Sequence, residues 1–256
     1  MPDTNLTPYI PETITVHLGA PDTPAQNVTL SFPDYIKNVG SSEIYPTWPE
    51  SALRANIYAQ ISFALNRVYT EFYRSRGYDF DITNSTAYDQ AFYYGRDVFG
   101  NISDIVDEIF NSYIVRQGFI EPLLAQYCDG NRVQCNGLSQ WGSVTLAQQG
   151  YTPYEILTYY YGDNIDIVRT DDVRGITSSV PEAPLREGSI GPDVELIQRR
   201  LNRIATNYPA IPKIYPITGT YGPETEEAVR AFQRIFNLTE DGIVGRATWY
   251  RILYLY

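Results

Sequence analysis

The feature that most constrains this chain is a break in its hydrophobic pattern between residues 169 and 184. The stretch RTDDVRGITSSVPEAP has few apolar residues and no periodicity, so it predicts a linker. Strong hydrophobic periodicity lies on both sides of it, and 256 residues are enough to bury two cores. The sequence therefore predicts two domains, residues 1–168 and residues 185–256.

Strand and helix patterns are mixed in the first predicted domain. The runs ETITVHL and NVTLSF alternate like two short strands among prolines. A helix is predicted over about residues 49–74, capped by Thr47 and Glu50 and ended at Gly77. Its apolar stripe has helical spacing: Leu53, Ile57, Ile61, Leu65, Val68 and Phe72. Further helices are predicted over residues 101–117, 139–149 and 152–162, so this domain is expected to be α+β.

The second predicted domain reads as all-α. Three segments have one apolar helical face each: DVELIQRRLNRIA, ETEEAVRAFQRIF and RATWYRILYLY. The stretches GTYGPET and GIVGRAT share the pattern G-x-apolar-G-x-x-T, and each opens a helix. Glycines there permit tight turns. We therefore expect a three-helix bundle.

The charge of the chain excludes several partners. The formal net charge is −11, and no basic stripe is present, so nucleic-acid binding is not expected. The same charge opposes adsorption to anionic lipid, and no apolar run approaches the roughly 20 residues of a membrane span. Residues 1–19 lack the basic start and apolar core of a signal peptide. A mature chain with an added Met, unconventional export and retention inside the cell all fit this.

The few cysteine and histidine residues limit the chemistry. Cys128 and Cys135 flank a turn-forming loop, CDGNRVQC, and either form a disulfide in an oxidising compartment or remain as free thiols. His17 is the only histidine, and its run TITVHLG is strand-like, so we expect a structural role for it. A zinc site usually needs four ligands, so neither a metal nor a cofactor is predicted.

The C-terminal part closely resembles the bacterial peptidoglycan-binding domain of the three-helix type. The matching positions are Leu185, Gly188, Ser189, Val194, Gln198, Leu201, Gly219 to Gly222, Thr225, Ala228, Val229, Phe232, Gln233, Asp241, Gly242, Gly245, Thr248 and Trp249. The resemblance implies non-covalent attachment to cell-wall peptidoglycan. Most of these positions are turn glycines or core residues. Tyr221, Gln233 and Trp249 are the candidates for contact with the wall polymer.

Residues 12–168 resemble, more distantly, the stage II sporulation protein D family. The first matching block consists of Glu43 to Pro46, Trp48, Pro49 and Ala52 to Asn56. The second block is NGLSQWGSVTLAQQGYTPYEILTYYYG. The resemblance implies a lytic transglycosylase that acts on glycan strands lacking peptide stems, with Glu43 as its acid. In that reaction the C6 hydroxyl of the sugar attacks the anomeric carbon, so one carboxylate with a raised pKa can suffice.

The chain also departs from the pattern of that family. Ile61 stands where the family has an Arg, Gln134 stands where it has a His, and DITNSTAYDQAF lacks the residues of its structural zinc site. Part of the site that is usual in that family is therefore absent or rebuilt in this chain.

Three interpretations follow from these observations. The first is an enzyme that cleaves glycan strands with Glu43, while Ser139, Gln140 and Trp141 line the cleft. The second is a non-catalytic protein whose degenerate N-terminal domain binds wall polymer, with the C-terminal domain as a second binding module. The third is a scaffold within an envelope or spore assembly. All three place the protein in the cell wall or outside the cell, including on the spore.

Overall fold

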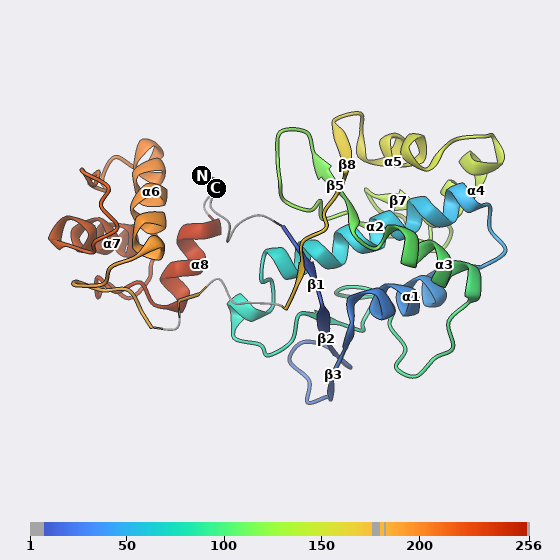
Figure 1. The fold of residues 1–256 in the computed structure, drawn as a ribbon, viewed down its shortest axis with the longest axis horizontal. Helices are drawn as coiled ribbons and strands as arrows, with labels where there is room; N and C mark the ends of the chain where they lie inside the picture. The colour runs from blue at the N-terminus through green and yellow to red at the C-terminus, as the bar shows by residue number, and fades with distance from the viewer. Residues whose placement is uncertain (1–7, 176–179, 182, 255–256) are drawn as a thin grey trace. The chain divides into compact units, whose positions relative to one another are not determined.

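The computed structural model describes residues 8–175, 180–181 and 183–254. The chain forms two compact units, Met1–Thr177 and Ser178–Tyr256, with helices and strands in the first unit (Figure 1). The boundary falls inside the predicted linker, part of which lies outside the described residues. Its first residues are not linker, because β8 (Ile165–Arg169) ends there and β9 (Val173–Arg174) pairs with β1 (Ile10–Pro11). A two-residue strand has too little sequence to show a period.

Short strands at the start of unit 1 form a mixed sheet. The two predicted strands are confirmed as β2 (Thr13–His17) and β3 (Asn27–Ser31), which pair antiparallel. Strand β4 (Ile82–Thr83) adds to β2 in parallel, giving the order β3-β2-β4. His17 is buried in β2, and its Nδ1 lies 2.7 Å from Asn27 Oδ1, as a structural residue would.

A helix that the sequence did not predict precedes the Glu43 region. Helix α1 (Phe32–Glu43) begins where Ser31 Oγ accepts a hydrogen bond from Asp34 N–H, and Pro33 sits in its first turn. Its C-terminal turns contain Gly40, Ser41 and Ser42, which are weak helix formers. Glu43 is therefore the last residue of one helix rather than an acid ahead of another.

Helix α2 (Glu50–Tyr69) is the central element of unit 1. It packs against α1, α3 (Gly100–Ile109), α4 (Gln140–Gln148), α5 (Pro153–Tyr161) and β5 (Ser112–Arg116), and Figure 1 shows it running through the unit. The predicted capping box is wrong: the helix starts after Pro49 with no side-chain cap, because Thr47 lies two residues before the N-cap position. A single 3₁₀ turn, Arg74–Arg76, follows and ends at Gly77 with φ 93°.

Buried polar side chains of α2 connect it to elements distant in sequence. Asn56 Nδ2 donates to Ser143 Oγ at 2.8 Å, and Ser62 Oγ accepts from Ile114 N–H at 2.8 Å. Gln60 is fully buried and reaches Glu43. An apolar helix surrounded on all sides is a core element. These few polar groups fix the register of the elements that surround it.

The predicted helix over residues 101–117 is only half correct. Helix α3 ends at Ile109, and Ser112–Arg116 forms β5, which pairs antiparallel with β8. The run YIVR is rich in β-branched residues, and this preference decides the segment once β8 offers a partner. The predicted helices near residues 139–149 and 152–162 are confirmed as α4 and α5, the latter with a capping box of Thr152 and Glu155. Strands β6 (Tyr127–Cys128) and β7 (Leu138–Ser139) pair in parallel before α4.

The described part of unit 2 carries the three predicted helices. These are α6 (Pro192–Asn207), α7 (Pro223–Ile235) and α8 (Arg246–Tyr254), and α6 packs against both of the others. Two isolated bridges, Leu185 with Val244 and Ile190 with Thr220, tie the loops together.

Candidate functional site

Glu43 lies at the C-terminal end of α1, and its partners among the described residues are neutral hydrogen-bond donors. Its Oε1 accepts from the backbone N–H of Ala91 at 2.7 Å, and its Oε2 accepts from Gln60 Nε2 at 3.0 Å. The hydroxyl of Tyr127 also hydrogen-bonds the carboxyl group. The side chain keeps partial access to solvent while protein groups enclose the carboxyl. This is the environment of a carboxylic acid and not of an ion pair.

The protonation of Glu43 is shifted toward neutral pH. Burial raises the pKa of Glu43 to about 7, and the hydrogen bonds from Tyr127, Ala91 and Gln60 oppose part of that rise. A helix C-terminus also disfavours a negative charge. A carboxyl with a pKa near 7 can both donate and accept a proton at neutral pH, as general acid–base catalysis requires.

A second set of hydrogen bonds holds the partners of Glu43 in place. Gln90 Nε2 donates to the Tyr127 oxygen at 2.9 Å and to the backbone carbonyl of Gln60 at 3.1 Å. Tyr35 donates its hydroxyl proton to Gln90 Oε1 at 3.0 Å. Because Tyr127 accepts from Gln90, its own proton is directed at Glu43. The sequence alone did not reveal Tyr127, Gln60 or Gln90, since they come from three separate segments.

Three aromatic rings form a cluster next to the end of α1. The Trp48 and Trp141 rings lie 5.0 Å apart, and the Tyr45 ring lies 5.7 Å from Trp48 and 5.8 Å from Trp141. Tyr45 is 58% exposed and Trp141 is 40% exposed, whereas Trp48 is nearly buried. The two matching sequence blocks thus meet in space. Exposed rings of this kind can stack on the apolar face of a sugar.

The three residues predicted from the SQW block have different environments. Ser139 Oγ caps α4 by accepting from Gly142 N–H at 2.9 Å, and Gln140 is buried. Ser139 is half-buried, and Trp141 is the exposed residue of the three. Gly142 permits close packing, because a Cβ there would lie 2.0 Å from the Tyr160 hydroxyl. Ser139 therefore fixes the start of the helix that carries Trp141, and its role in lining a cleft stays a prediction, as does that of Gln140.

A disulfide loop supports the same tryptophan. Cys128 and Cys135 are joined, and their Cα atoms lie 6.1 Å apart. Within the loop, three backbone N–H groups, that of Val133 foremost, hold the pKa of Asp129 below its usual value. The carbonyl oxygen of Asp129 accepts from Trp141 N–H at 3.1 Å. The loop is therefore attached directly to the start of α4.

Ile61 and Gln134, which replace an Arg and a His of the stage II sporulation protein D pattern, bring no charge to Glu43. Ile61 is fully buried in the core, and Gln134 donates to the carbonyl of Gly130 within the disulfide loop. Among the residues that the structure describes, no three His, Cys, Asp or Glu side chains converge as a metal site would require. No helix in that part of the chain is long and apolar enough to cross a bilayer.

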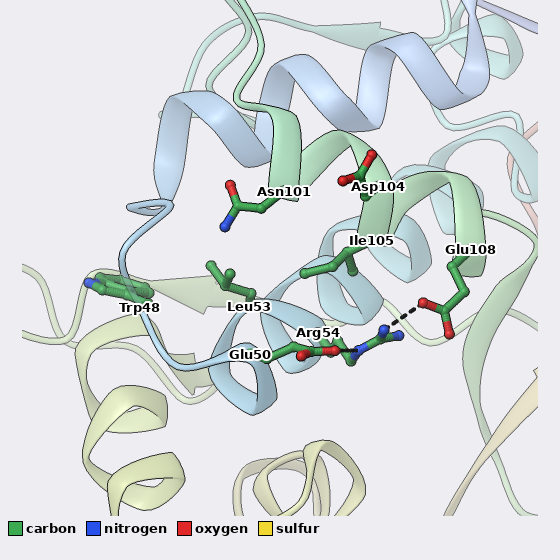
Figure 2. Close-up of a pocket in the computed structure, with 8 residues that line it drawn as sticks. All are labelled: Trp48, Glu50, Leu53, Arg54, Asn101, Asp104, Ile105 and Glu108. Carbon is green, nitrogen blue, oxygen red and sulfur yellow. Dashed lines mark hydrogen bonds and ion pairs between the residues drawn. The ribbon is translucent and has the colours of Figure 1, made fainter.

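A pocket of about 310 Å³ lies between α2 and α3 and does not include Glu43 (Figure 2). Trp48, Leu53 and Ile105 form its apolar wall. Its central cation, Arg54, already pairs with Glu50 at 2.7 Å and with Glu108 at 2.5 Å. Arg54 is thus paired with carboxylates of the pocket wall itself. The pocket borders the aromatic cluster only through Trp48.

In unit 2, the buried side chain of Gln198 connects the two ends of the first copy of the repeated pattern, GTYGPET. Gln198 Oε1 accepts from the backbone N–H of Gly219 at 3.0 Å, and its Nε2 donates to Thr225 Oγ1 at 3.0 Å. Gly219 has φ 69°, which a residue with a side chain rarely adopts. The first glycine and the final threonine of the pattern are therefore the two ends of one glutamine bridge.

The second copy repeats this arrangement around Gln233. Its Oε1 accepts from Gly242 N–H at 2.9 Å, and its Nε2 donates to Thr248 Oγ1 at 3.1 Å. Tyr221, Gln233 and Trp249 are each only 1% exposed. The three residues considered for contact with wall polymer are thus packed into the core, where they hold the loops and helices in place.

Comparison with known proteins identifies this second unit. The family model of the peptidoglycan binding domain matches residues 190–252. The zinc D-Ala-D-Ala carboxypeptidase of Streptomyces albus G is 39% identical over 71 residues, which make up 28% of this chain and 26% of that enzyme. The chain thus spans about a quarter of the length of this relative. No solved structure matches this chain. Residues 190–252 are a peptidoglycan-binding domain, which is consistent with an association with the cell wall.

Proposed function

We propose that the protein attaches to peptidoglycan through unit 2, as a compact three-helix bundle, and cleaves glycan strands at Glu43 by lytic transglycosylation. Unit 1 is then a divergent relative of stage II sporulation protein D. The observation that carries the proposal is the Glu43 carboxyl, whose pKa is raised to about 7 beside exposed aromatic rings.

The chemistry needs only one carboxyl group. Protonated Glu43 gives its proton to the glycosidic oxygen, and the bond from that oxygen to the anomeric carbon breaks. The C6 hydroxyl of the same sugar attacks that carbon, and its proton passes to the Glu43 carboxylate. The product is a 1,6-anhydro sugar, and the acid is restored without any water. The donors from Ala91, Gln60 and Tyr127 stabilise the carboxylate formed in between.

The aromatic cluster supplies a surface for the strand. Tyr45 follows Glu43 by two residues, and its exposed ring lies 5.8 Å from the ring of Trp141. Sugar rings stacked on these faces would be oriented next to the acid. Unit 2 keeps the enzyme on its insoluble substrate and raises the local concentration of strands.

The test uses the full chain and purified wall glycan, both intact and stripped of peptides. We expect the wild type to release anhydro sugars, detected by mass spectrometry, and Glu43→Gln to release none. Glu12→Gln is the matched control, since Glu12 is an exposed acid before β2. If the wild type releases no anhydro product from either substrate, the catalytic proposal is wrong.

A second candidate function is wall binding without catalysis. The buried Ile61 favours it, because this position offers no charge to a reacting sugar. Co-sedimentation of the full chain with insoluble peptidoglycan, together with the absence of anhydro product, would select this function. Loss of co-sedimentation would contradict both candidates.

A further inference from the structure

The three groups that donate hydrogen bonds to Glu43 are all connected to one residue, Gln90. The Tyr127 hydroxyl accepts from Gln90 Nε2 at 2.9 Å, and the backbone carbonyl of Gln60 accepts from the same nitrogen at 3.1 Å. The third donor is the N–H of Ala91, which belongs to the peptide bond between Gln90 and Ala91. Gln90 itself is fully buried. Its side chain thus joins the separate segments that supply donors to the acid.

The direction of these hydrogen bonds follows from the Gln60 carbonyl. A backbone carbonyl can only accept, so the end of the Gln90 amide that faces it must be the nitrogen. The other end, Oε1, then accepts from the Tyr35 hydroxyl at 3.0 Å. The second N–H of Gln90 is donated to the Tyr127 oxygen. Tyr127 therefore keeps its own proton for Glu43, and the hydrogen bond that it receives strengthens the one that it donates.

The backbone around Gln90 is held independently of the Gln90 side chain. On the N-terminal side, the Asp89 carboxylate accepts from Thr83 N–H at 2.9 Å and from Thr83 Oγ1 at 2.8 Å. On the C-terminal side, Asn38 Oδ1 accepts from Tyr93 N–H at 3.0 Å, and Asn38 Nδ2 donates to the Tyr93 carbonyl at 2.9 Å. A change of the Gln90 side chain should therefore alter its hydrogen bonds and leave the path of the backbone in place.

Among the described residues, the titratable groups that face Glu43 are two tyrosines. Tyr127 comes from β6 and Tyr35 from α1, and burial raises the pKa of each well above its usual value. Both hydroxyls therefore remain donors at neutral pH. The carboxylate that acts on Tyr35, Asp89, is ion-paired with Arg67 at 2.8 Å. Burial and hydrogen bonds, rather than a neighbouring charge, therefore govern the pKa of Glu43.

We propose that Gln90 is a positioning residue for the acid: its amide directs the Tyr127 hydroxyl at Glu43 and so determines the pH range in which Glu43 changes its charge. The hydrogen bond from Tyr127 stabilises the carboxylate form, so a fixed hydroxyl helps the acid to release its proton. Without it, burial would keep Glu43 protonated to higher pH, and transfer of the proton to the glycosidic oxygen would become slower. This inference rests on the function proposed above for the same site.

The experiment measures the pKa of Glu43 directly. Carbon-13 NMR of the glutamate carboxyls follows the titration of the full chain, and the Glu43 signal is assigned by its loss in Glu43→Gln. We expect Gln90→Met, which keeps the length of the side chain without its donors, to raise the pKa of Glu43 by about one pH unit, the size of one hydrogen bond to a charged group. Gln90→Glu should raise it further, because the introduced oxygen accepts the Tyr127 proton and adds a negative charge. Unfolding would lower this pKa toward 4.5, so a loss of structure does not imitate the rise.

A double substitution tests whether Gln90 acts through Tyr127. In the Tyr127→Phe background there is no hydroxyl to direct, so Gln90→Met should cause no further rise in the pKa of Glu43. Asn66→Leu is the matched control, since Asn66 is a buried amide of α2 that donates to the Pro122 carbonyl at 2.8 Å. The control should leave the pKa of Glu43 unchanged.

An unmoved pKa of Glu43 in Gln90→Met, or an equal rise in the Tyr127→Phe background, would overturn the inference. The titration needs no turnover, so this inference and the catalytic proposal fail separately. If the wild type releases no anhydro sugar while Gln90→Met shows the rise, the catalytic proposal is wrong and the control of Glu43 by Gln90 stands. If the wild type cleaves glycan and the pKa stays unmoved in Gln90→Met, only the role of Gln90 is wrong.

Discussion

Replacing Glu43 by glutamine should stabilise unit 1 at alkaline pH. The carboxyl has a pKa of about 7 in the folded protein against 4.5 in its ordinary state, so folding favours its protonated form. Below about pH 4.5 both states are protonated and Glu43 contributes no pH dependence. As pH rises from 4.5 to 7, the unfolded chain releases its proton first, and the free energy of unfolding falls.

The size of the change in the free energy of unfolding follows from the pKa shift of Glu43. A difference of about 2.5 pKa units corresponds to about 3 kcal/mol lost above pH 7, as an upper value for a partly accessible group. Glu43→Gln keeps an acceptor for the Ala91 N–H but cannot ionise. The Oε1 atom of Gln60 has no hydrogen-bond partner, so a flip of that amide can accept from the introduced side chain. The variant should therefore gain up to about 3 kcal/mol at pH 8 and almost nothing at pH 4.

The assay is urea unfolding at pH 4 and pH 8, read by hydrogen exchange of peptides from α2 so that unit 1 is followed separately. Carboxyls with lowered pKa values, such as Asp129 and Glu155, titrate in both proteins and cancel in the difference. Glu12→Gln, an exposed control, should show no pH-dependent gain. An equal effect of Glu43→Gln at both pH values would refute the reasoning, because it would mean that the Glu43 pKa is ordinary.

Three further changes test the site and the wall-binding unit. Tyr127→Phe removes a hydrogen bond that lowers the pKa of Glu43, so the alkaline limb of the cleavage–pH profile should move to higher pH; an unmoved limb contradicts the assigned contact. Trp141→Ala removes an exposed ring and should weaken binding of glycan oligosaccharides about ten-fold by calorimetry, with unchanged affinity as the contrary result. Gln233→Ala removes the partner of the buried Gly242 N–H and of Thr248 Oγ1 and should cost unit 2 about 2 kcal/mol in urea unfolding, with an unchanged unfolding midpoint as the contrary result.

Sequence patterns predicted the helices that have a long apolar run or clear end signals. Helix α2 has a long apolar run, and α4 and α5 have clear end signals, so all three were expected. Helix α1 was missed because Gly40, Ser41 and Ser42 weaken its pattern, although Ser31 and Pro33 marked its start. The segment after Ile109 became a strand only because β8 lies beside it. A local preference cannot report a partner that arrives later in the chain.

The sequence by itself predicted a peptidoglycan-binding domain at residues 185–256, because the pattern G-x-apolar-G-x-x-T recurs before two helices, and the family model matches residues 190–252 of it. It also singled out Glu43 and Trp141 as candidates. The tertiary structure decided how Glu43 is protonated, since its donors lie 17 and 48 residues away and burial sets its pKa. Desolvation and hydrogen bonding depend on what folding brings around a carboxyl group, and no run of neighbouring residues specifies that.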